Sequence, residues 1–425
     1  GEPRRMSPRV DECVDGDRLR ADIERNGAFG ATDGEGHGRT NTTGSEANRE
    51  ARELLVSRFE AAGLTVEVDA VGNLVGRWNP PEASGAAVAA GSHLDSVPDG
   101  GLFDGPLGVY AALEAVRAMQ DAGVTPVRPV EVVSFTEEEG ATFASGLLGS
   151  SVAAGERTVE DALALTDADG RTLAEALDDV GFRGEGRLDA AAWDAWLELH
   201  VEQHTDLERA GAQAGVVTDV TGITHCEATV AGEANHAGAT PMGAERTDAL
   251  AAASEFVLAM EAAAEDRTEV DPAAVATVGS LTVAPNATNV VPGRVEAGLD
   301  VRSVEYDSME ALCRRAREEL DRLERERGVE TAFARGFDLE PTPMAGRCRD
   351  ALSAAGESAG VETRSLHSGA AHDSMHVATV TDAGMLFAPS RDGISHSPAE
   401  WTDWSDCTAA TRVLAGALAD LAGAE

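Results

Sequence analysis

The stretch AVAAGSHLDSVPDGGLFDGPLG, residues 87–108, determines the expected fold and the expected chemistry of this chain. Its first residues form a short apolar run typical of a buried strand, and this run leads into His93 and Asp95. A glycine-rich loop then brings a second carboxylate, Asp104, eleven residues after His93. Imidazole and carboxylate groups together are typical ligands of zinc-like divalent ions, and Asp95 is spaced to hold the second nitrogen of a ligating His93. A lone His-x-Asp pattern is common, so the interpretation depends on the rest of the chain.

Apolar runs and helical stretches alternate on both sides of this segment. We predict a helix at 46–62, buried strands at 88–91 and 130–136, and a second helix at 108–122. This alternation is typical of a mostly parallel sheet with helices on both faces. Ligands in such folds bind beyond the carboxyl ends of the strands, where His93 and the next acidic run both fall. The sequence therefore predicts an α/β domain with a mostly parallel mixed sheet and a site at that edge.

A second domain is expected at 219–338, because the pattern of elements changes there. The order strand-helix-strand-strand-helix-strand predicts two helices on an antiparallel sheet, an α+β sandwich. These elements are expected at 223–231, 246–264, 275–283, 295–302, 308–327 and 329–337. Residues 1–218 and 339–425 would then form a discontinuous catalytic domain. Within it, we expect the acidic, alanine-rich segment 161–188 to be helical.

The composition is strongly acidic. The formal net charge is −41, from 75 acidic and 34 basic residues, and every basic side chain is arginine. Such a chain repels nucleic acid and anionic membranes, so neither is an expected partner. Because 43% of the residues are hydrophobic and fall in periodic runs, we expect a globular fold. The acid excess predicts a halophilic surface, since molar salt shortens the Debye length to about 3 Å; an ordinary acidic protein is the alternative.

The cysteines and the hydropathy indicate a cytoplasmic protein. The five cysteines are odd in number and form no Cys-x-x-Cys pair, which favours reduced thiols over a disulfide framework. No apolar run approaches the roughly 20 residues needed to span a membrane. The N-terminal residues are polar and contain no signal-peptide core.

Four further segments contain side chains suited to metal or carboxylate chemistry. Glu137-Glu138-Glu139 follows an apolar strand, where three carboxylates would repel one another without a cation, although a solvated acidic loop is an alternative. His200 lies among alternating apolar residues in LELHVEQ, and His396 lies in a tight loop, GISHSPAE. His236 lies in the Gly/Pro-rich segment NHAGATPM, and a later strand ends at Arg302, whose planar fork suits a carboxylate. Each signal is weak by itself.

Together these segments resemble the hydantoinase/carbamoylase family of amidases. That family includes N-carbamoyl-L-amino acid hydrolases, ureidopropionases and allantoate amidohydrolases, and it belongs with the aminoacylase-like dinuclear zinc peptidases. The resemblance runs from about residue 72 to residue 400. It implies an inserted lid and dimerisation domain, a homodimer, and two divalent ions per subunit, zinc foremost with manganese or cobalt as alternatives. The implied substrate is a small ureido or amide compound with a free carboxylate.

The resemblance also implies roles for individual residues in the metal centre. One ion would be bound by His93, Asp104 and His200. The second would be bound by Asp104, Glu139 and His396, so that Asp104 bridges the two ions. Glu138 would act as the general base towards water.

Further roles concern the substrate. His236, from the inserted domain, would stabilise the oxyanion. Asn289 and Arg302 would bind the substrate carboxylate, together with Gln203. Gly369 would line the site in the segment SGAAHD, whose His372 and Asp373 we interpret as structural supports. The chain departs from the family pattern in three places, with His204 and Ala371 where glycine is usual and a loose match at 36–41.

These features predict hydrolysis of the C–N bond of an N-carbamoyl-L-amino acid or a related ureido acid. The products would be ammonia, carbon dioxide and the amino acid. An allantoate amidohydrolase, which would share the catalytic residues, is the nearest alternative, and a peptidase is less favoured. A non-catalytic binding protein on the same fold is an alternative of another class, but the complete ligand set and Glu138 disfavour it.

Overall fold

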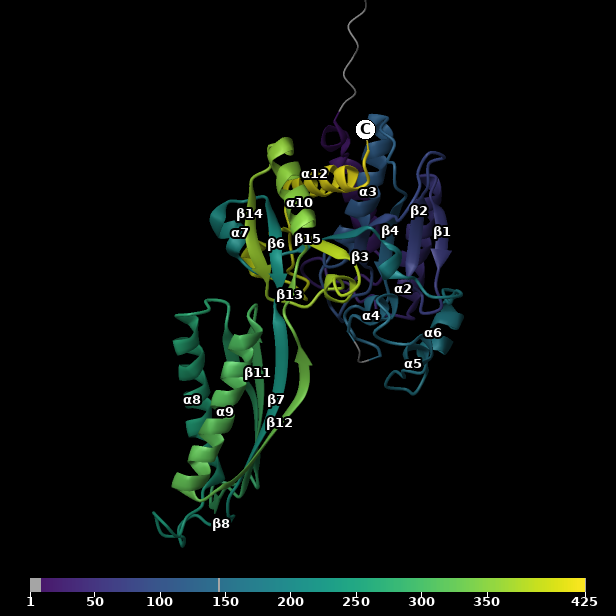
Figure 1. Cartoon of the computed structure of the whole chain (residues 1–425). Helices are drawn as coiled ribbons and strands as arrows, with labels where there is room; N and C mark the ends of the chain where they lie inside the picture. Colours follow the sequence, from purple (N-terminus) through teal and green to yellow (C-terminus); the bar gives the residue numbers. More distant parts are fainter. Residues whose placement is uncertain (1–8, 144–145, 425) are drawn as a thin grey trace, which may run out of the picture. The chain divides into compact units, whose positions relative to one another are not determined.

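The computed structural model describes residues 9–143 and 146–424, which form two compact units (Figure 1). One unit is built from Gly1–Thr218 and Pro343–Glu425, and the other is Asp219–Thr342. We refer to them as the large unit and the inserted unit. That the inserted unit acts as a lid or in dimerisation stays a prediction.

The large unit contains a mixed sheet whose centre is parallel. Strands β4, β3, β5 and β15 are neighbours and run parallel to one another. Strands β1 and β2 extend this sheet antiparallel on the β4 side, and β6 pairs antiparallel with β15. The predicted α/β class with a mainly parallel sheet is confirmed. The strands are β1 (Thr65–Val68), β2 (Leu74–Trp78), β3 (Val88–His93), β4 (Val130–Phe135), β5 (Ala195–Val201), β6 (Ala214–Val220), β13 (Thr342–Pro343), β14 (Thr363–Ser368) and β15 (Asp382–Ala388).

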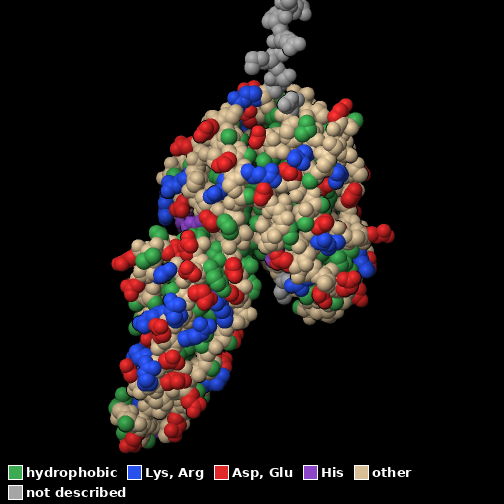
Figure 2. All heavy atoms as spheres, viewed as in Figure 1, with side chains coloured by type: hydrophobic (Ala, Val, Ile, Leu, Met, Phe, Trp, Pro, Cys, Tyr) green, Lys and Arg blue, Asp and Glu red, His purple; other side chains and the backbone are tan. Residues whose placement is uncertain are grey.

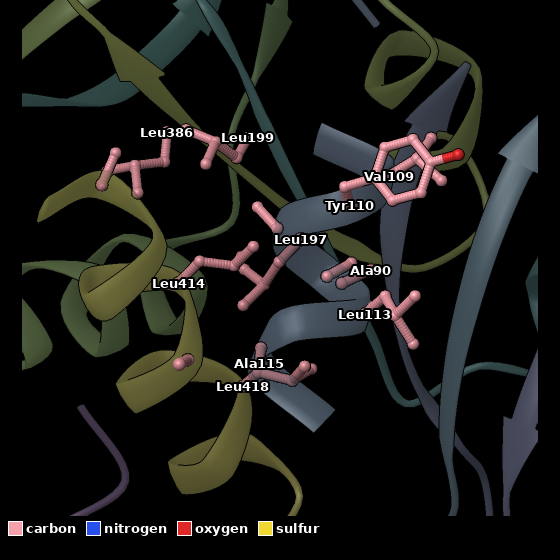
Figure 3. Packing of buried hydrophobic residues seen from close by; sticks show 14 of the residues in the cluster. Ala90, Val109, Tyr110, Leu113, Ala115, Leu197, Leu199, Leu386, Leu414 and Leu418 are labelled. Carbon is pink, nitrogen blue, oxygen red and sulfur yellow. The ribbon is translucent and has the colours of Figure 1, made fainter. Parts of the chain in front are cut away.

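Helix α3 (Pro106–Ala122) crosses the core directly after the Asp104 loop. Pro106 favours its start, and Gly123 ends it in the left-handed conformation. Nearly every side of α3 is buried, and it packs against strands β3 and β5 and helix α12 (Figure 3). The packed side chains labelled there are Ala90, Val109, Tyr110, Leu113, Ala115, Leu197, Leu199, Leu386, Leu414 and Leu418. Since burying one leucine contributes about 1.5–3 kcal/mol, this core fixes the strands that carry the site.

The remaining helices of the large unit lie around this core. The longer ones are α1 (Gly16–Gly27), α2 (Glu46–Ala61), α10 (Gly346–Ala359) and α12 (Trp404–Leu421). The shorter ones are α4 (Leu148–Ala153), α5 (Val159–Leu163), α6 (Leu173–Val180), α7 (Asp206–Ala210), α11 (Ser374–Val377) and the 3-10 turns η1 (Val10–Cys13), η2 (Ala190–Ala192) and η3 (Arg391–Gly393). The prediction of a helical segment at 161–188 is wrong over most of its length. Asp167 accepts main-chain bonds from Asp169 and Arg171 and forms a turn that separates α5 from α6.

The inserted unit has a separate antiparallel sheet, in the order β12-β7-β11-β9. Helices α8 and α9 lie side by side over this sheet and share its core (Figure 1). The elements are β7 (Gly222–Ala231), α8 (Ala249–Thr268), β9 (Val275–Ala284), β11 (Arg294–Ser303), α9 (Tyr306–Arg327), β12 (Glu330–Leu339) and a small ladder of β8 (Asn235–His236) with β10 (Val290–Val291). Helix α8 begins later than predicted, because the Asp248 side chain accepts the amides of Leu250 and Ala251 as an N-cap.

Acidic side chains are spread over the face shown in Figure 2, with arginines among them. Many arginines of the described residues form ion pairs, for example Arg20 with Glu24 and Arg391 with Asp403. In the part of the chain that the structure describes, no helix is both long and apolar enough to cross a membrane.

Candidate metal centre

The carboxyl ends of the four parallel strands bring the predicted metal ligands together. Strand β3 ends at His93, and His200 is the residue before the end of β5. Glu138 and Glu139 follow β4, and the loop after β15 carries His396. Parallel strands end at the same edge of a sheet, so side chains far apart in the sequence meet there.

Asp104 lies between two groups of ligands. Its Oδ1 is 3.5 Å from Nε2 of His93 and 3.3 Å from Nε2 of His200. Its Oδ2 is 3.4 Å from Nε2 of His396, which is also 3.2 Å from Oε2 of Glu139. Neighbouring donors of a tetrahedral zinc site lie about 3.3 Å apart when the bonds are about 2.0–2.1 Å long. Asp104 thus offers one oxygen to each group, as a bridging carboxylate must.

The hydrogen bonds of His93 and His200 leave one nitrogen of each ring available. Nδ1 of His93 is 3.1 Å from the Asp95 carbonyl, and Nδ1 of His200 is 3.0 Å from the Val201 carbonyl. Carbonyl oxygens only accept, so Nδ1 of each ring carries a proton and Nε2 is the nitrogen left to bind a metal. Both Nε2 atoms are buried and have no hydrogen-bond partner. A bound cation would satisfy them, so these residues fit a metal.

Asp95 acts through both its main chain and its side chain. The carbonyl makes the bond to His93, while the nearer carboxylate oxygen is 3.6 Å from that Nδ1. The carboxylate instead accepts the amide of Glu138 at 3.3 Å and that of Glu139 at 3.1 Å. Asp95 therefore connects the His93 strand end to the acidic run after β4.

The three consecutive glutamates have different surroundings. Glu137 has a positive φ of 56°, and its carboxylate accepts the amides of Thr142 and Phe143, each at 2.7 Å. It is thus bound into the following turn, whereas Oε2 of Glu138 lies 3.7 Å from Nε2 of His93. The positive φ at Glu137 turns the chain sharply after β4.

Burial and like charge shift the carboxyl groups towards the protonated form. The pKa of Glu138 is raised well above its usual range by burial and then by the charge of Glu139. Burial and then the charge of Asp104 raise the pKa of Glu139 to about 8. Crowded carboxylates of this kind need a cation to ionise together.

The pKa values of the three histidines shift in different directions: that of His93 falls, and those of His200 and His396 rise. Burial lowers the pKa of His93 to about 4, which keeps its imidazole neutral, as a metal ligand must be. The hydrogen bond to Asp104 is the main reason that the pKa of His396 rises to about 9. For His200 burial acts downward, but the negative charge of Asp104, 3.3 Å from Nε2, outweighs it and raises the pKa to about 10. Without metal, protons thus take the place of cations around Asp104.

Sequence reasoning missed two residues beneath Asp104. Glu400 is buried, and its Oε1 accepts the amides of Phe103 at 2.7 Å and Asp104 at 3.0 Å. Oγ of Ser395 lies 2.7 Å from Oδ2 of Asp104 and 2.8 Å from Oε2 of Glu400. Both residues stand in the GISHSPAE segment, but only its histidine has a recognisable ligand signal. Their contacts depend on main-chain amides that no spacing rule reveals.

Gln203 and the segment after β14 also reach this centre. Nε2 of Gln203 is 3.2 Å from Oδ2 of Asp104, and its Oε1 is buried without a partner. The ring of His372 lies 4.6 Å from that of His200, and its Nε2 is 2.9 Å from Oγ of Ser368. Gly369 follows Ser368 in the exposed part of the same segment.

His236 and Asn289 lie together in the inserted unit. Strand β8, which contains His236, pairs with β10, and the Asn289 carbonyl accepts the amide of Ala237 at 2.9 Å. Nδ1 of His236 accepts the amides of Gly238 at 3.1 Å and Ala239 at 3.0 Å. The ring proton must therefore be on Nε2, which makes Nε2 a hydrogen-bond donor.

Arg302 lies at the other end of the inserted sheet. Arg294, at the start of β11, pairs with Ala231, the last residue of β7, after which the chain continues to β8. Ser303, next to Arg302, pairs with Gly222, the first residue of β7. Arg302 is eight positions after Arg294 on this extended strand, a span of roughly 26 Å. The Arg302 guanidinium pairs with Asp300 through Nε–Oδ1 at 2.8 Å and Nη2–Oδ2 at 3.1 Å.

An α/β sheet with histidines and carboxylates gathered at the carboxyl edge of its parallel strands is the arrangement of a class of hydrolases whose members generally use divalent metal ions. The model of peptidase family M20/M25/M40 matches residues 89–420, so the chain belongs to that family. The predicted resemblance to hydantoinase/carbamoylase amidases is confirmed by relatives and by solved structures.

Three similar proteins indicate the branch of the family. An N-carbamoyl-L-amino-acid amidohydrolase from Paenarthrobacter aurescens is 39% identical over 94% of this chain and 96% of its own length. One from Geobacillus stearothermophilus is 39% identical over 97% of this chain and its whole length. An allantoate amidohydrolase from Bacillus subtilis is 32% identical over 88% of this chain and 90% of its own.

The fold agrees with a solved structure of the same branch. The crystal structure of an amidase of the hydantoinase/carbamoylase family from Burkholderia multivorans has a TM-score of 0.90 and 37% identity to this chain. The match covers 96% of this chain and 98% of that one.

Proposed function

We propose that the chain is a metal-dependent amidohydrolase that cleaves the C–N bond of an N-carbamoyl-L-amino acid or a related ureido acid. The products are ammonia, carbon dioxide and the amino acid. The observation that carries the proposal is Asp104, with one carboxylate oxygen towards each of two ligand groups. The two N-carbamoyl-L-amino acid amidohydrolases that are 39% identical over nearly the whole chain support the substrate class.

The ligand set favours two divalent ions. His93, Asp104 and His200 would hold one ion, and Asp104, Glu139 and His396 the other. Mixed imidazole and carboxylate ligands suit zinc, with manganese or cobalt as alternatives. Two such ions would polarise the substrate carbonyl and lower the pKa of water.

Glu138 is the proposed general base. Its carboxyl group lies beside the His93 ring, within reach of water at the centre, and makes no ion pair with arginine among the described residues. Glu138 takes a proton from the attacking water and later donates it to the leaving nitrogen.

Residues of both units bind the substrate in this proposal. The Nε2–H of His236 donates to the oxyanion, and the two amides on Nδ1 keep the ring in that form. Arg302 and Asn289 bind the substrate carboxylate, so Arg302 would exchange Asp300 for the substrate. The unpartnered Oε1 of Gln203 accepts a substrate N–H, and Gly369 lines the pocket.

The separation of His236 from Arg302 favours a homodimer. In one inserted unit, Arg302 and the β8–β10 ladder with His236 lie towards opposite ends of β11, whose residues 294–302 span roughly 26 Å, a long way for both side chains to reach one small substrate. A second copy would supply one of them, and closure of the inserted unit as a lid would complete the site. We place this enzyme in the cytoplasm of a cell with high internal salt, in keeping with its free cysteines and its charge of −41.

Ammonia release in molar potassium chloride tests the proposal. The protein is loaded with zinc, manganese or cobalt and assayed on N-carbamoyl-L-amino acids, ureidopropionate and allantoate. We expect turnover of N-carbamoyl-L-amino acids, and at least 100-fold slower turnover by Glu138→Gln. Preference for allantoate would favour the alternative that the Bacillus subtilis relative supports. Bound metal without turnover of any of these substrates would indicate a non-catalytic binding protein.

A further inference from the structure

Arg39 is a fully buried cation in the large unit that the proposed chemistry does not use. It belongs to the segment 36–41, which matches the family pattern only loosely. Its guanidinium donates three hydrogen bonds, and every acceptor is a main-chain carbonyl. Nη1 donates to Leu94, Nε to Gly101 and Nη2 to Asp104, each at 2.8 Å.

These three carbonyls belong to the loop that joins His93 to Asp104. Leu94 directly follows the first ligand, and the carbonyl of Asp104 belongs to the bridging ligand itself. The main chain of Arg39 adds a reciprocal pair of bonds to Gly100, at 3.0 and 2.8 Å. The Arg39 guanidinium therefore bonds to both ends of the segment 94–104.

The neighbouring residues reinforce the same loop. The amide of Asn41 donates to Oγ of Ser96, and the amide of Ser96 donates to the Asn41 carbonyl, both at 2.9 Å. Oγ1 of Thr40 accepts the amide of Asp99 at 2.9 Å. Residues 39–41 thus run along the His93–Asp104 loop and are hydrogen-bonded to it, and Arg39 is the fully buried residue at the start of this segment.

The positive charge of Arg39 also matters, because carbonyl groups solvate a buried guanidinium but do not neutralise it. The carboxylates of Asp104 and Glu400 act on it electrostatically, followed by those of Asp95 and Glu139. These include two of the proposed metal ligands. The guanidinium therefore offsets part of the repulsion among carboxylates that must ionise together when metal binds.

A close approach at Gly105 shows how little freedom the loop has. Gly105 has a φ of 83°, and a Cβ there would lie 2.6 Å from the His93 ring. A shift of the loop at Asp104 would thus disturb both ligands together. The Arg39 side chain donates to carbonyl groups of this loop, and the Glu400 side chain accepts from its amide groups.

We propose that Arg39 is a positioning residue of the metal centre, one that fixes Asp104 relative to His93 and so sets the affinity for metal. The proposal rests on the metal centre of the proposed function, not on the identity of the substrate. Its geometry also indicates that lysine is a poor replacement. An ammonium group donates from a single nitrogen, so it cannot reach three carbonyls that each accept from a different nitrogen of the planar guanidinium.

The test compares Arg39→Met and Arg39→Lys with the wild type and with a matched control, Arg117→Met. Arg117 is an arginine of α3 whose side chain is 11% exposed and pairs with Asp22 at 2.7 Å. Removing it also deletes a largely buried cation but leaves the His93–Asp104 loop intact. Each metal-free protein is titrated with zinc against a chromophoric chelator, and its cobalt form is examined by visible absorption.

We expect both Arg39 variants to bind zinc about 10- to 100-fold more weakly than the wild type, as loss of a residue supporting metal ligands does elsewhere. Their cobalt spectra should shift, whereas Arg117→Met should keep the wild-type affinity and spectrum. Unchanged zinc affinity in a folded Arg39→Met protein would overturn the proposal. If that variant does not fold, wild-type affinity in Arg39→Lys overturns it equally.

The titrations also separate this inference from the proposed function. A wild-type protein that binds two ions but hydrolyses no ureido acid would refute the function, while the Arg39 comparison would still decide the inference. A wild-type protein that binds no zinc or cobalt would overturn the inference, since there would be no centre to position.

Discussion

The carboxylate of Asp95 accepts the main-chain amide of Glu139 at 3.1 Å, and so joins the end of β3 to the turn after β4. Its other oxygen accepts the amide of Glu138, and its carbonyl fixes the tautomer of His93. One residue thus orients a proposed ligand on one strand and the proposed base and a further ligand on the next. The two strands are neighbours in the sheet, which makes this short connection possible.

Replacing Asp95 with Asn should therefore weaken metal binding. The side-chain amide keeps one acceptor oxygen, so one of the two main-chain amides after β4 loses its partner. We expect zinc affinity to fall about 10- to 100-fold, and turnover to fall with it at limiting metal. Asp99→Asn is the control, since Asp99 is exposed in the same loop and its side chain touches none of these groups. Equal zinc affinity in the Asp95 and Asp99 variants would contradict the role assigned here.

Glu138→Gln should separate chemistry from metal binding. Glutamine has almost the same shape but cannot accept a proton, so turnover should fall at least 100-fold while two ions stay bound. His93→Ala should lose metal as well, because it removes a ligand. Metal content by elemental analysis and ammonia release measure the two effects. A Glu138→Gln enzyme that retains most of its activity would refute the assignment of the base.

The metal-free protein should lose stability as the pH rises from about 6.5 to 8. Burial first of all raises the pKa of Glu139 to about 8 and that of Glu400 to about 7. Burial lowers the pKa of His200 and His396, but Asp104 outweighs it and raises these pKa values to about 10 and about 9. The native state therefore holds more protons than the unfolded chain across this range, and each extra proton contributes a slope of about −1.4 kcal/mol per pH unit.

Saturating zinc should remove this trend, because ligands bind metal in their deprotonated form. Urea unfolding at several pH values, with and without zinc, provides the measurement. His93 acts in the opposite direction but in a lower pH range. Burial lowers its pKa to about 4, so its contribution destabilises the native state as the pH falls below about 6.5, the pKa of histidine in the unfolded chain. Stability of the metal-free form that rises between pH 6.5 and 8 would contradict the crowding of carboxylates seen here.

A mixed dimer should test which copy supplies His236. If it acts on the partner's site, a dimer of one Glu138→Gln chain and one His236→Ala chain has one complete site, and about half of the wild-type activity is expected. If each inserted unit serves its own large unit, the mixed dimer has no complete site. Differently tagged chains, purified together and assayed beside each parent variant, distinguish these results. An inactive mixed dimer would refute the contribution from a second copy.

Local patterns were enough to predict the parallel sheet and the side chains at its edge. His93 follows an apolar run, and strand order brings it to the edge of the sheet where the acidic run after residue 136 also falls. Asp104 in its glycine-rich loop and His200 among alternating apolar residues are assigned through the family resemblance. The roles of Glu400 and Ser395 could not be predicted, because they depend on main-chain amides and on burial created by distant segments. The same holds for Glu137, which stands in the acidic run but bonds within its own turn.

Potassium chloride should continue to stabilise this protein at molar concentrations. The chain has 75 acidic side chains, and its 34 arginines offset only part of their charge, which leaves −41. At low salt the carboxylates repel one another across distances of about 10 Å or more, whereas at 1 M the Debye length is about 3 Å and mainly close pairs still interact. We expect the unfolding temperature to rise steadily between 0.1 and about 2 M salt, at fixed zinc. Circular dichroism during heating measures it, and replacing several exposed glutamates with glutamine should flatten the dependence. An unfolding temperature and activity that are the same in dilute buffer as in molar salt would refute halophilic adaptation, because the repulsion would then be too weak to matter.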